Sequence, residues 1–180
     1  MIEKLLNKTT IELIDLIAKE PTYVRDIAEK LKTSPGYVFK IIHLLKKHNI
    51  VGEKRQKNRK IIFLNNENIF TRKIRALINT EKISRNIHFR ELMKEGAVGI
   101  YGSYAEGMDD NLSDIDLWVC TEKPSYEIQK VVTELEKNMK KKISFLLLNS
   151  KKIRELKTND YEFYIRLKLT STVFGGNLFD

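Results

Sequence analysis

The stretch AVGIYGSYAEGMDDNLSDIDLWVC, residues 97–120, decides the fold of the second half of the chain. It begins with a short apolar run, residues 97–101, which predicts a buried strand. It ends with a second strand-like run, residues 114–120. Because successive side chains of a strand point to opposite faces, Asp114 and Asp116 share one face, roughly 7 Å apart at their Cα atoms. Two such carboxylates repel each other unless a cation lies between them, and hard oxygen ligands on one face suit Mg²⁺.

A phosphate-binding turn is predicted between the two strands. Gly102 and Ser103 follow the first strand and open a short helix, so their backbone N–H groups and the serine hydroxyl are available to a phosphate. The order Gly102-Ser103, ten further residues and Asp114-x-Asp116 resembles the signature of nucleotidyltransferases of the polymerase-beta superfamily, in particular the minimal nucleotidyltransferases of prokaryotes. The resemblance implies that Gly102 and Ser103 bind the nucleotide through its triphosphate. It also implies that Asp114 and Asp116 are the catalytic residues and the ligands of Mg²⁺ or Mn²⁺.

The flanking segments fit the same resemblance. We expect a helix over residues 81–94, a second helix over 125–139 and a third strand over 143–148. In the loop before Asp114, we interpret Asp109 and Asp110 as solvated charges. We likewise interpret Lys140, Lys141 and Lys142 as the solvated end of a helix, where the C-terminal dipole favours cations.

Two positions depart from the family pattern. The family often has a basic residue where Glu106 stands, and its third strand usually supplies a third carboxylate where this chain has Ser144. A serine is neither a strong metal ligand nor a base for the acceptor hydroxyl. The nearest acids outside that strand are Glu136, Asp160 and Glu162. Either a displaced acid substitutes, or the substrate supplies the base, or catalysis is weak or lost.

The first 65 residues read as a different module. Apolar side chains at helical spacing predict helices over residues 9–19 and 23–31 and a third helix that begins near Pro35. Two strand-like pieces, 50–52 and 61–64, then flank a hairpin tip that is rich in lysine and arginine.

This order of elements resembles the winged helix-turn-helix of MarR- and ArsR-like transcriptional regulators. The resemblance implies that the third helix enters the major groove of double-stranded DNA and that the hairpin wing contacts its backbone or minor groove. The DNA-binding residues would then be Tyr37, Lys40, Lys54, Arg55, Lys57 and Arg59.

The charge distribution supports two modules with opposite electrostatics. The 180 residues carry a formal net charge of +9, with 42% hydrophobic residues and one cysteine. Residues 1–65 hold 14 basic and 7 acidic side chains, whereas residues 95–122 hold seven acids and no lysine or arginine.

The apolar content excludes a disordered chain, the single cysteine excludes a disulfide scaffold, and no apolar run approaches the roughly 20 residues of a membrane span. Because the N-terminus lacks the apolar core of a signal peptide, we expect a cytoplasmic protein.

We therefore predict an α+β chain with an N-terminal winged helix-turn-helix followed by a small mixed-sheet nucleotidyltransferase domain. The expected divisions are a DNA-binding domain at 1–65, a connecting helix at 66–80 and the nucleotidyltransferase domain at 81–180. The expected activity is transfer of NMP from a nucleoside triphosphate to an acceptor hydroxyl with Mg²⁺. The alternative is a transcriptional regulator or antitoxin whose second domain binds a nucleotide or a protein without turnover. As partners we expect the triphosphate, double-stranded DNA, a toxin or other acceptor protein, and a second copy of the chain.

Overall fold

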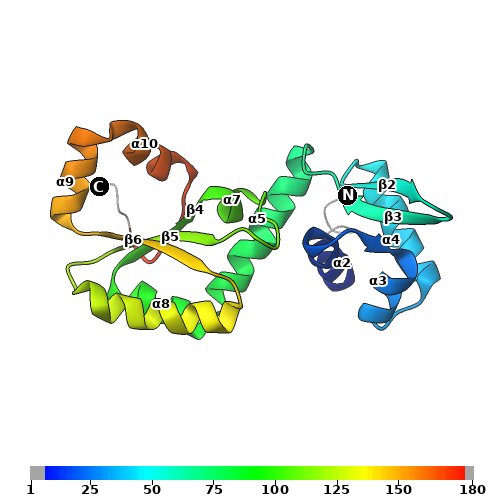
Figure 1. The fold of residues 1–180 in the computed structure, drawn as a ribbon, viewed down its shortest axis with the longest axis horizontal. Helices are drawn as coiled ribbons and strands as arrows, with labels where there is room; N and C mark the ends of the chain where they lie inside the picture. The colour runs from blue at the N-terminus through cyan, green and yellow to red at the C-terminus, as the bar shows by residue number, and fades with distance from the viewer. Residues whose placement is uncertain (1–6, 177–180) are drawn as a thin grey trace. The chain divides into compact units, whose positions relative to one another are not determined.

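The computed structural model describes residues 7–176, and it has two compact units that meet in sequence between Ile78 and Asn79. The outermost residues of the predicted domains, 1–6 and 177–180, lie outside this description. Figure 1 shows the course of the chain. Within the described part, none of the helices combines the length and hydropathy that a membrane crossing needs.

The first unit contains three short helices and a three-stranded antiparallel sheet of order β1-β3-β2. Its elements are α2 (Lys8–Lys19), β1 (Thr22–Tyr23), α3 (Val24–Lys30), α4 (Pro35–Lys47), β2 (Val51–Gln56) and β3 (Arg59–Leu64). Side-chain caps begin α2 and α4: Asn7 accepts from the N–H of Thr10, and Ser34 accepts from the N–H of Tyr37. The apolar faces of the helices meet in one core with β3, which includes Leu13, Ile14, Ile27, Val38, Ile42, Leu45 and Ile62. The predicted helix, helix, turn, helix and hairpin are confirmed.

The second unit is built on a four-stranded mixed sheet of order β6-β5-β4-β7. Helix α5 (Ile69–Ser84) leads into it, followed by α6 (Ile87–Glu95), β4 (Ala97–Tyr101), α7 (Gly102–Glu106), β5 (Ile115–Cys120), α8 (Ser125–Met139), β6 (Ile143–Leu148), α9 (Ser150–Asn159), α10 (Tyr161–Thr170) and β7 (Thr172–Phe174). Strands β5 and β6 run parallel because α8 connects them, whereas β4 is antiparallel to both of its neighbours.

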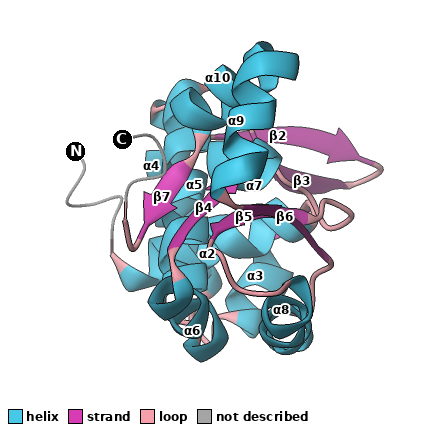
Figure 2. Cartoon of the chain, turned by 90° about the vertical axis from the view of Figure 1, so that its left-hand side faces the viewer, coloured by secondary structure: helices cyan, strands magenta, loops and turns pink. Residues whose placement is uncertain are grey.

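The two faces of this sheet have different partners. One face packs on α6 and α8 through Ile100, Leu117, Val119, Phe89 and Leu135. The other face packs on α9 and α10, as Figure 2 shows, in a smaller core centred on Trp118, Leu148 and Leu167. Alternation along β5 places Asp116 on this second face, beside Trp118.

The helix predicted over residues 81–94 is in fact two helices. Helix α5 ends at Ser84, and α6 begins at Ile87 after an N-cap at Asn86. The side chain of Asn86 accepts from the N–H of His88 and donates to Asn138 Oδ1 at 2.7 Å. An asparagine cap of this kind competes with a continuous helix, because its side chain satisfies a backbone N–H that would otherwise have no partner.

Candidate functional site

The predicted pair of acids lies where β5 begins, at the edge of the sheet face that α9 and α10 cover. In the parallel ladder, Asp116 is the register partner of Ser144 on β6. The Ser144 hydroxyl donates to Asp114 Oδ2 at 3.3 Å. The third strand therefore brings a neutral hydroxyl to the carboxylate pair, at the position where the family pattern has an acid.

The protonation of Asp116 depends on its surroundings. Partial burial raises the pKa of Asp116 above its ordinary value, and the negative charge of Asp114 raises it further. Asp114 has a cation of its own nearby, because Lys142 Nζ lies 3.3 Å from its Oδ2 atom. Burial and the charge of Asp116 likewise raise the pKa of Tyr101, which pairs with Asp116 across β4 and β5. The site thus holds more negative charge than the neighbouring side chains neutralise.

Gly102 turns the chain from β4 into α7 against Asp116. Its φ is +66°, and a Cβ atom built on it would lie 2.6 Å from Asp116 Oδ2. Glycine alone meets both requirements, because other residues are disfavoured at positive φ and would press on the carboxylate. Ser103 follows on the first turn of α7 and is half-buried. The Gly-Ser turn and the acid pair are therefore adjacent in space.

Substitution of Gly102 by alanine is expected to lower the free energy of unfolding by about 1–2 kcal/mol, the cost of a left-handed conformation for a residue with a Cβ, with the contact to Asp116 adding to it. Urea denaturation followed by circular dichroism measures this loss. The matched control is Gly36→Ala on α4, where an added Cβ meets nothing within 4 Å. We expect that change to be neutral or stabilising. Equal stability of the two variants would contradict the role given to Gly102.

The donor atoms of this site fit one hard divalent cation. Asp114, which directly precedes β5, and Asp116, its second residue, supply carboxylate oxygens, and Mg²⁺ in phosphate-binding sites is commonly held by one or two carboxylates together with substrate phosphates. Among residues 7–176, no cluster of three or more histidine, cysteine or acidic side chains is arranged to hold a metal ion. Glu136, Asp160 and Glu162 are therefore not gathered with Asp114 and Asp116 into such a cluster in the described part of the chain.

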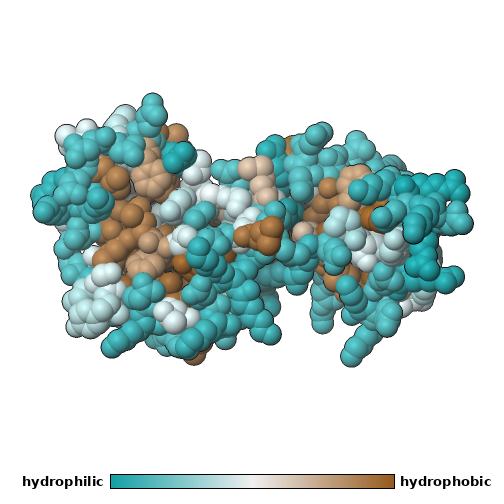
Figure 3. Space-filling model, in the orientation of Figure 1, coloured by the Kyte–Doolittle hydropathy of each residue, from teal (hydrophilic) through white to brown (hydrophobic). Residues whose placement is uncertain are grey.

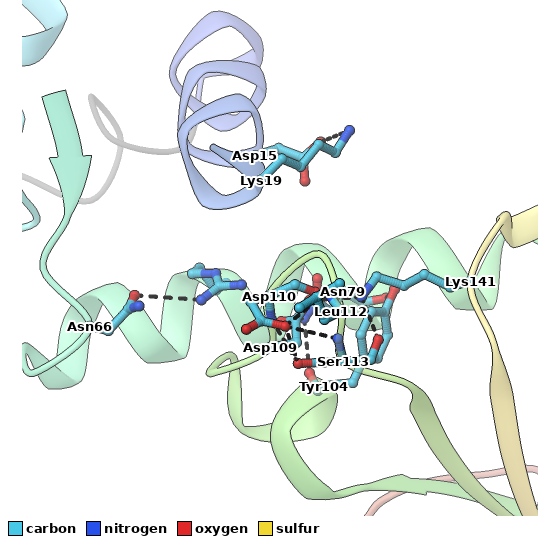
Figure 4. Close-up of polar contacts among 11 residues, drawn as sticks. Asp15, Lys19, Asn66, Asn79, Tyr104, Asp109, Asp110, Leu112, Ser113 and Lys141 are labelled. Carbon is cyan, nitrogen blue, oxygen red and sulfur yellow. Dashed lines mark hydrogen bonds and ion pairs between the residues drawn. The ribbon is translucent and has the colours of Figure 1, made fainter. Parts of the chain in front are cut away.

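The loop between α7 and β5 is held from two sides, as Figure 4 shows. Asn79, on α5, donates from Nδ2 to the Tyr104 carbonyl at 2.9 Å and to Asp109 Oδ1 at 2.7 Å. Lys141 donates from Nζ to the carbonyls of Asp110 and Ser113, at 2.7 Å each. The sequence did not predict the contacts of Asn79 and Lys141 with this loop. Both residues are far from the loop along the chain, and no local pattern reveals such contacts.

Two interpretations of charged residues need correction here. Asp109 is only 8% exposed and is hydrogen bonded to Asn79, so it is not a solvated loop charge. The side chain of Lys141 is 22% exposed and points into the loop, whereas that of Lys142 is 74% exposed. Asp110 is exposed, as predicted, and its carboxylate accepts from the backbone N–H groups of Leu112 and Ser113. The hydrogen bond from the Ser113 hydroxyl is the largest cause of the lowered pKa of Asp110, and the two backbone N–H bonds lower it further.

An apolar surface lies beside the acid pair on the same sheet face. Trp118 is fully buried, and its Nε1 donates to Ser171 Oγ at 2.9 Å. Around it, Tyr101, Leu146 and Phe163 are only partly buried. Figure 3 shows apolar surface in the region between the sheet and helices α9 and α10. Trp118 is thus a core residue, while its neighbours leave apolar surface open to solvent.

In the first unit, the exposed face of α4 carries the predicted contact residues. Tyr37 is 43% exposed, and Lys40 is also exposed. Phe39 is 63% exposed and was not among the residues predicted to contact DNA. It lies off the buried stripe of α4, which consists of Val38, Ile41, Ile42 and Leu45. An exposed aromatic side chain on this helix suits contact with thymine methyl groups.

The hairpin wing, β2 and β3, carries exposed cations at its tip and is held by ion pairs near its start. Glu53 on β2 bridges Lys46 of α4 at 2.9 Å and Lys60 of β3 at 3.0 Å, and these hydrogen bonds lower the pKa of Glu53. Arg59 lies over the ring of Tyr23, 5.5 Å from its centroid. Lys54, Arg55 and Lys57 are exposed around the two-residue turn, where Lys57 has a φ of 53°. The tip of the wing therefore presents a cluster of cations to solvent.

Comparison with protein families identifies one part of the chain. Residues 81–161 match the family described as polymerase beta, nucleotidyltransferase. This range includes Gly102, Ser103, Asp114, Asp116 and Ser144. None of the curated proteins compared with the chain matches it.

Three solved structures are similar to part of this chain. A homodimeric winged helix-turn-helix DNA-binding domain from Mycobacterium bovis, described as a possible ArsR-family regulator, is 18% identical and covers 46% of this chain and 71% of its own, with a TM-score of 0.38. A protein from Archaeoglobus fulgidus is 23% identical over 48% of this chain and 99% of its own, with a TM-score of 0.39. The zinc-responsive MarR-family protein ZitR of Lactococcus lactis is 20% identical over 75% of this chain and 74% of its own, with a TM-score of 0.38. Because these scores are low, the winged-helix description of the first unit rests on its own order of elements.

Proposed function

We propose that this chain, which carries a nucleotidyltransferase domain of the polymerase-beta family at residues 81–161, is a DNA-binding protein that holds a magnesium–nucleoside triphosphate as a ligand. The observation that carries the ligand role is the pairing of Ser144 with Asp116 across β5 and β6. Among residues 7–176, this arrangement offers two carboxylates for one cation and gathers no third acid with them to take a proton from an acceptor hydroxyl.

The residues of this site divide the work of binding. Asp114 and Asp116 would hold the Mg²⁺, which when bound offsets the charge of the phosphate oxygens. Gly102 and Ser103 would receive the phosphates through their backbone N–H groups and the Ser103 hydroxyl. The absence of a Cβ at Gly102 allows this turn to lie against Asp116. The open apolar surface formed by Tyr101, Leu146 and Phe163 is the nearest place for the nucleobase.

Transfer of NMP to an acceptor hydroxyl is the second candidate function. It is favoured by the family match and by the intact pair Asp114 and Asp116, which family members use to bind divalent metals. In this reaction the acceptor oxygen would bond to the α-phosphate, pyrophosphate would leave, and the hydroxyl proton would pass to the substrate or to solvent. Ser144, bonded to Asp114 at 3.3 Å, offers no base for that proton.

Isotopically labelled nucleoside triphosphates distinguish the two functions. The full chain is incubated with ATP, GTP, CTP and UTP in turn, with Mg²⁺ or Mn²⁺, and both retained and transferred label are measured. We expect the protein to retain label from one or more triphosphates and to transfer none. The same triphosphates should raise the melting temperature of the protein. A ligand at 100 times its Kd stabilises the folded state by about 2.7 kcal/mol. Rapid transfer of label would favour the second candidate, and absence of both signals would contradict the proposal.

The first unit would bind double-stranded DNA in the usual winged-helix geometry, with α4 in the major groove and the wing on the backbone. Lys40, Tyr37 and Phe39 would face the bases, and Lys54, Arg55 and Lys57 the phosphates. A homodimer would place two such units on adjacent half-sites. A toxin partner has no supporting observation in the described residues or in the comparisons.

A further inference from the structure

Lys141 occupies an unusual place for a lysine at the end of a helix. Helix α8 ends at Met139, and Lys140 caps it in the left-handed conformation, with a φ of 53°. This turn directs the next side chain back toward the loop between α7 and β5. Lys141 Nζ donates to the carbonyls of Asp110 and Ser113 at 2.7 Å, and Asp109 Oδ2 lies 3.8 Å away.

The loop that Lys141 holds ends at the metal-binding pair. Ser113 immediately precedes Asp114, and its N–H and hydroxyl also donate to the carboxylate of Asp110. The backbone N–H that follows Asp114, that of Ile115, donates to the carbonyl of Lys142 at 2.9 Å. The backbone before Asp114 is therefore held by the two hydrogen bonds from Lys141, here called the Lys141 clamp. The backbone after Asp114 is held by the hydrogen bond from Ile115 to Lys142.

We propose that Lys141 is a positioning residue that fixes Asp114 for cation binding by holding the backbone of the preceding loop. This inference rests on the proposed binding of a divalent cation by Asp114 and Asp116. Hydrogen bonds from a charged donor are stronger than those from a neutral one, and Lys141 makes two of them to this loop. A ligand held loosely by its backbone binds metal more weakly, because binding must then order the loop.

The neighbouring Lys142 provides a matched control with the opposite expectation. Its ammonium lies 3.3 Å from Asp114 Oδ2 and competes with a cation for that carboxylate. Methionine at either position removes one positive charge from the same stretch. If charge alone mattered, both variants would bind a divalent cation more tightly than the unmodified chain. The positioning role predicts opposite changes.

Mn²⁺ titration of the full chain, followed by the electron paramagnetic resonance signal of free Mn²⁺, measures this difference. We expect Lys141→Met to weaken Mn²⁺ binding by about 10-fold, in the range found for residues that support metal ligands, and Lys141→Arg to restore most of it. We expect Lys142→Met to bind Mn²⁺ at least as tightly as the unmodified chain, with a gain of no more than about 5-fold, because the pair it removes is exposed.

Hydrogen exchange without metal is the second readout. Faster exchange of the amides at 110–115 in Lys141→Met, but not in Lys142→Met, is expected if the clamp orders the loop. If Lys141→Met fails to fold, Lys141→Gln tests the same contact with a neutral donor. Mn²⁺ binding by Lys141→Met equal to or tighter than that of the unmodified chain would overturn the inference while leaving the proposed function intact. Absence of Mn²⁺ binding by the unmodified chain would overturn both.

Discussion

Replacement of Asp114 and Asp116 by asparagine is expected to abolish binding of a manganese–nucleoside triphosphate, with a loss of more than about 100-fold in affinity. Removing a residue that merely supports a metal ligand already costs about 10–100-fold, and this change removes both charged ligands. Disappearance of the triphosphate-dependent rise in melting temperature measures the loss. Glu106→Gln is the control, because it removes one acid from the same acidic stretch on the exposed side of α7. Undiminished binding by the double variant would place the nucleotide elsewhere.

Ionised Asp116 should lower the stability of the metal-free protein at neutral pH. The folded-state pKa of Asp116 is raised by burial and by Asp114, so its favourable contribution is fully present below the unfolded-state pKa. That contribution is lost as the pH rises through the raised folded-state value. Asp116→Asn is therefore expected to raise the melting temperature of the metal-free chain at pH 7, with a smaller effect at pH 3. Cation affinity should instead fall as the pH is lowered, because acid protonates the carboxylate ligand.

Exchange of the three cations at the wing tip, Lys54, Arg55 and Lys57, for glutamine is expected to weaken DNA binding by at least about 100-fold at 50 mM salt. Each lost phosphate contact lowers the slope of log affinity against log salt by about 0.9, so the triple variant should lose about 3 from that slope. Fluorescence anisotropy with a labelled duplex at several salt concentrations measures both quantities. The loss should be similar for unrelated DNA sequences, because phosphate contacts carry no base information.

A matched control separates local contact from net charge. Lys151, Lys152 and Arg154 are also two lysines and one arginine, all exposed on α9 in the second unit. Glutamine at these three positions removes the same charge from the chain. We expect DNA affinity and salt slope to stay close to those of the unmodified protein. If both triple variants lose affinity equally, the basic character of the whole chain, and not the wing, accounts for binding.

Local patterns in the sequence predicted most elements because their causes are local. The apolar stripes of α2 and α4, the caps before them and the cation-rich hairpin can all be read within short windows. The break between α5 and α6 was missed because Asn86 is stabilised as a cap partly by Asn138, a residue far along the chain. Phe39 lies off the buried stripe of α4, a placement that the same local pattern gives, although it was not among the predicted contact residues.

The sequence by itself predicted Asp114 and Asp116 as a pair on one strand face, since the two-residue period of a strand is a property of the backbone. In the structure Asp116 lies on β5 and Asp114 directly precedes that strand. It also determined that Ser144 stands on the next strand of that sheet. Only the tertiary structure decided that Ser144 faces Asp116 and is hydrogen bonded to Asp114. The register of the parallel strands β5 and β6 depends on how α8, which connects them, packs on the sheet. Only the tertiary structure brought Asn79 and Lys141 to the loop before Asp114. Contacts between residues about 30 positions apart depend on how whole elements pack, and no local pattern encodes that packing.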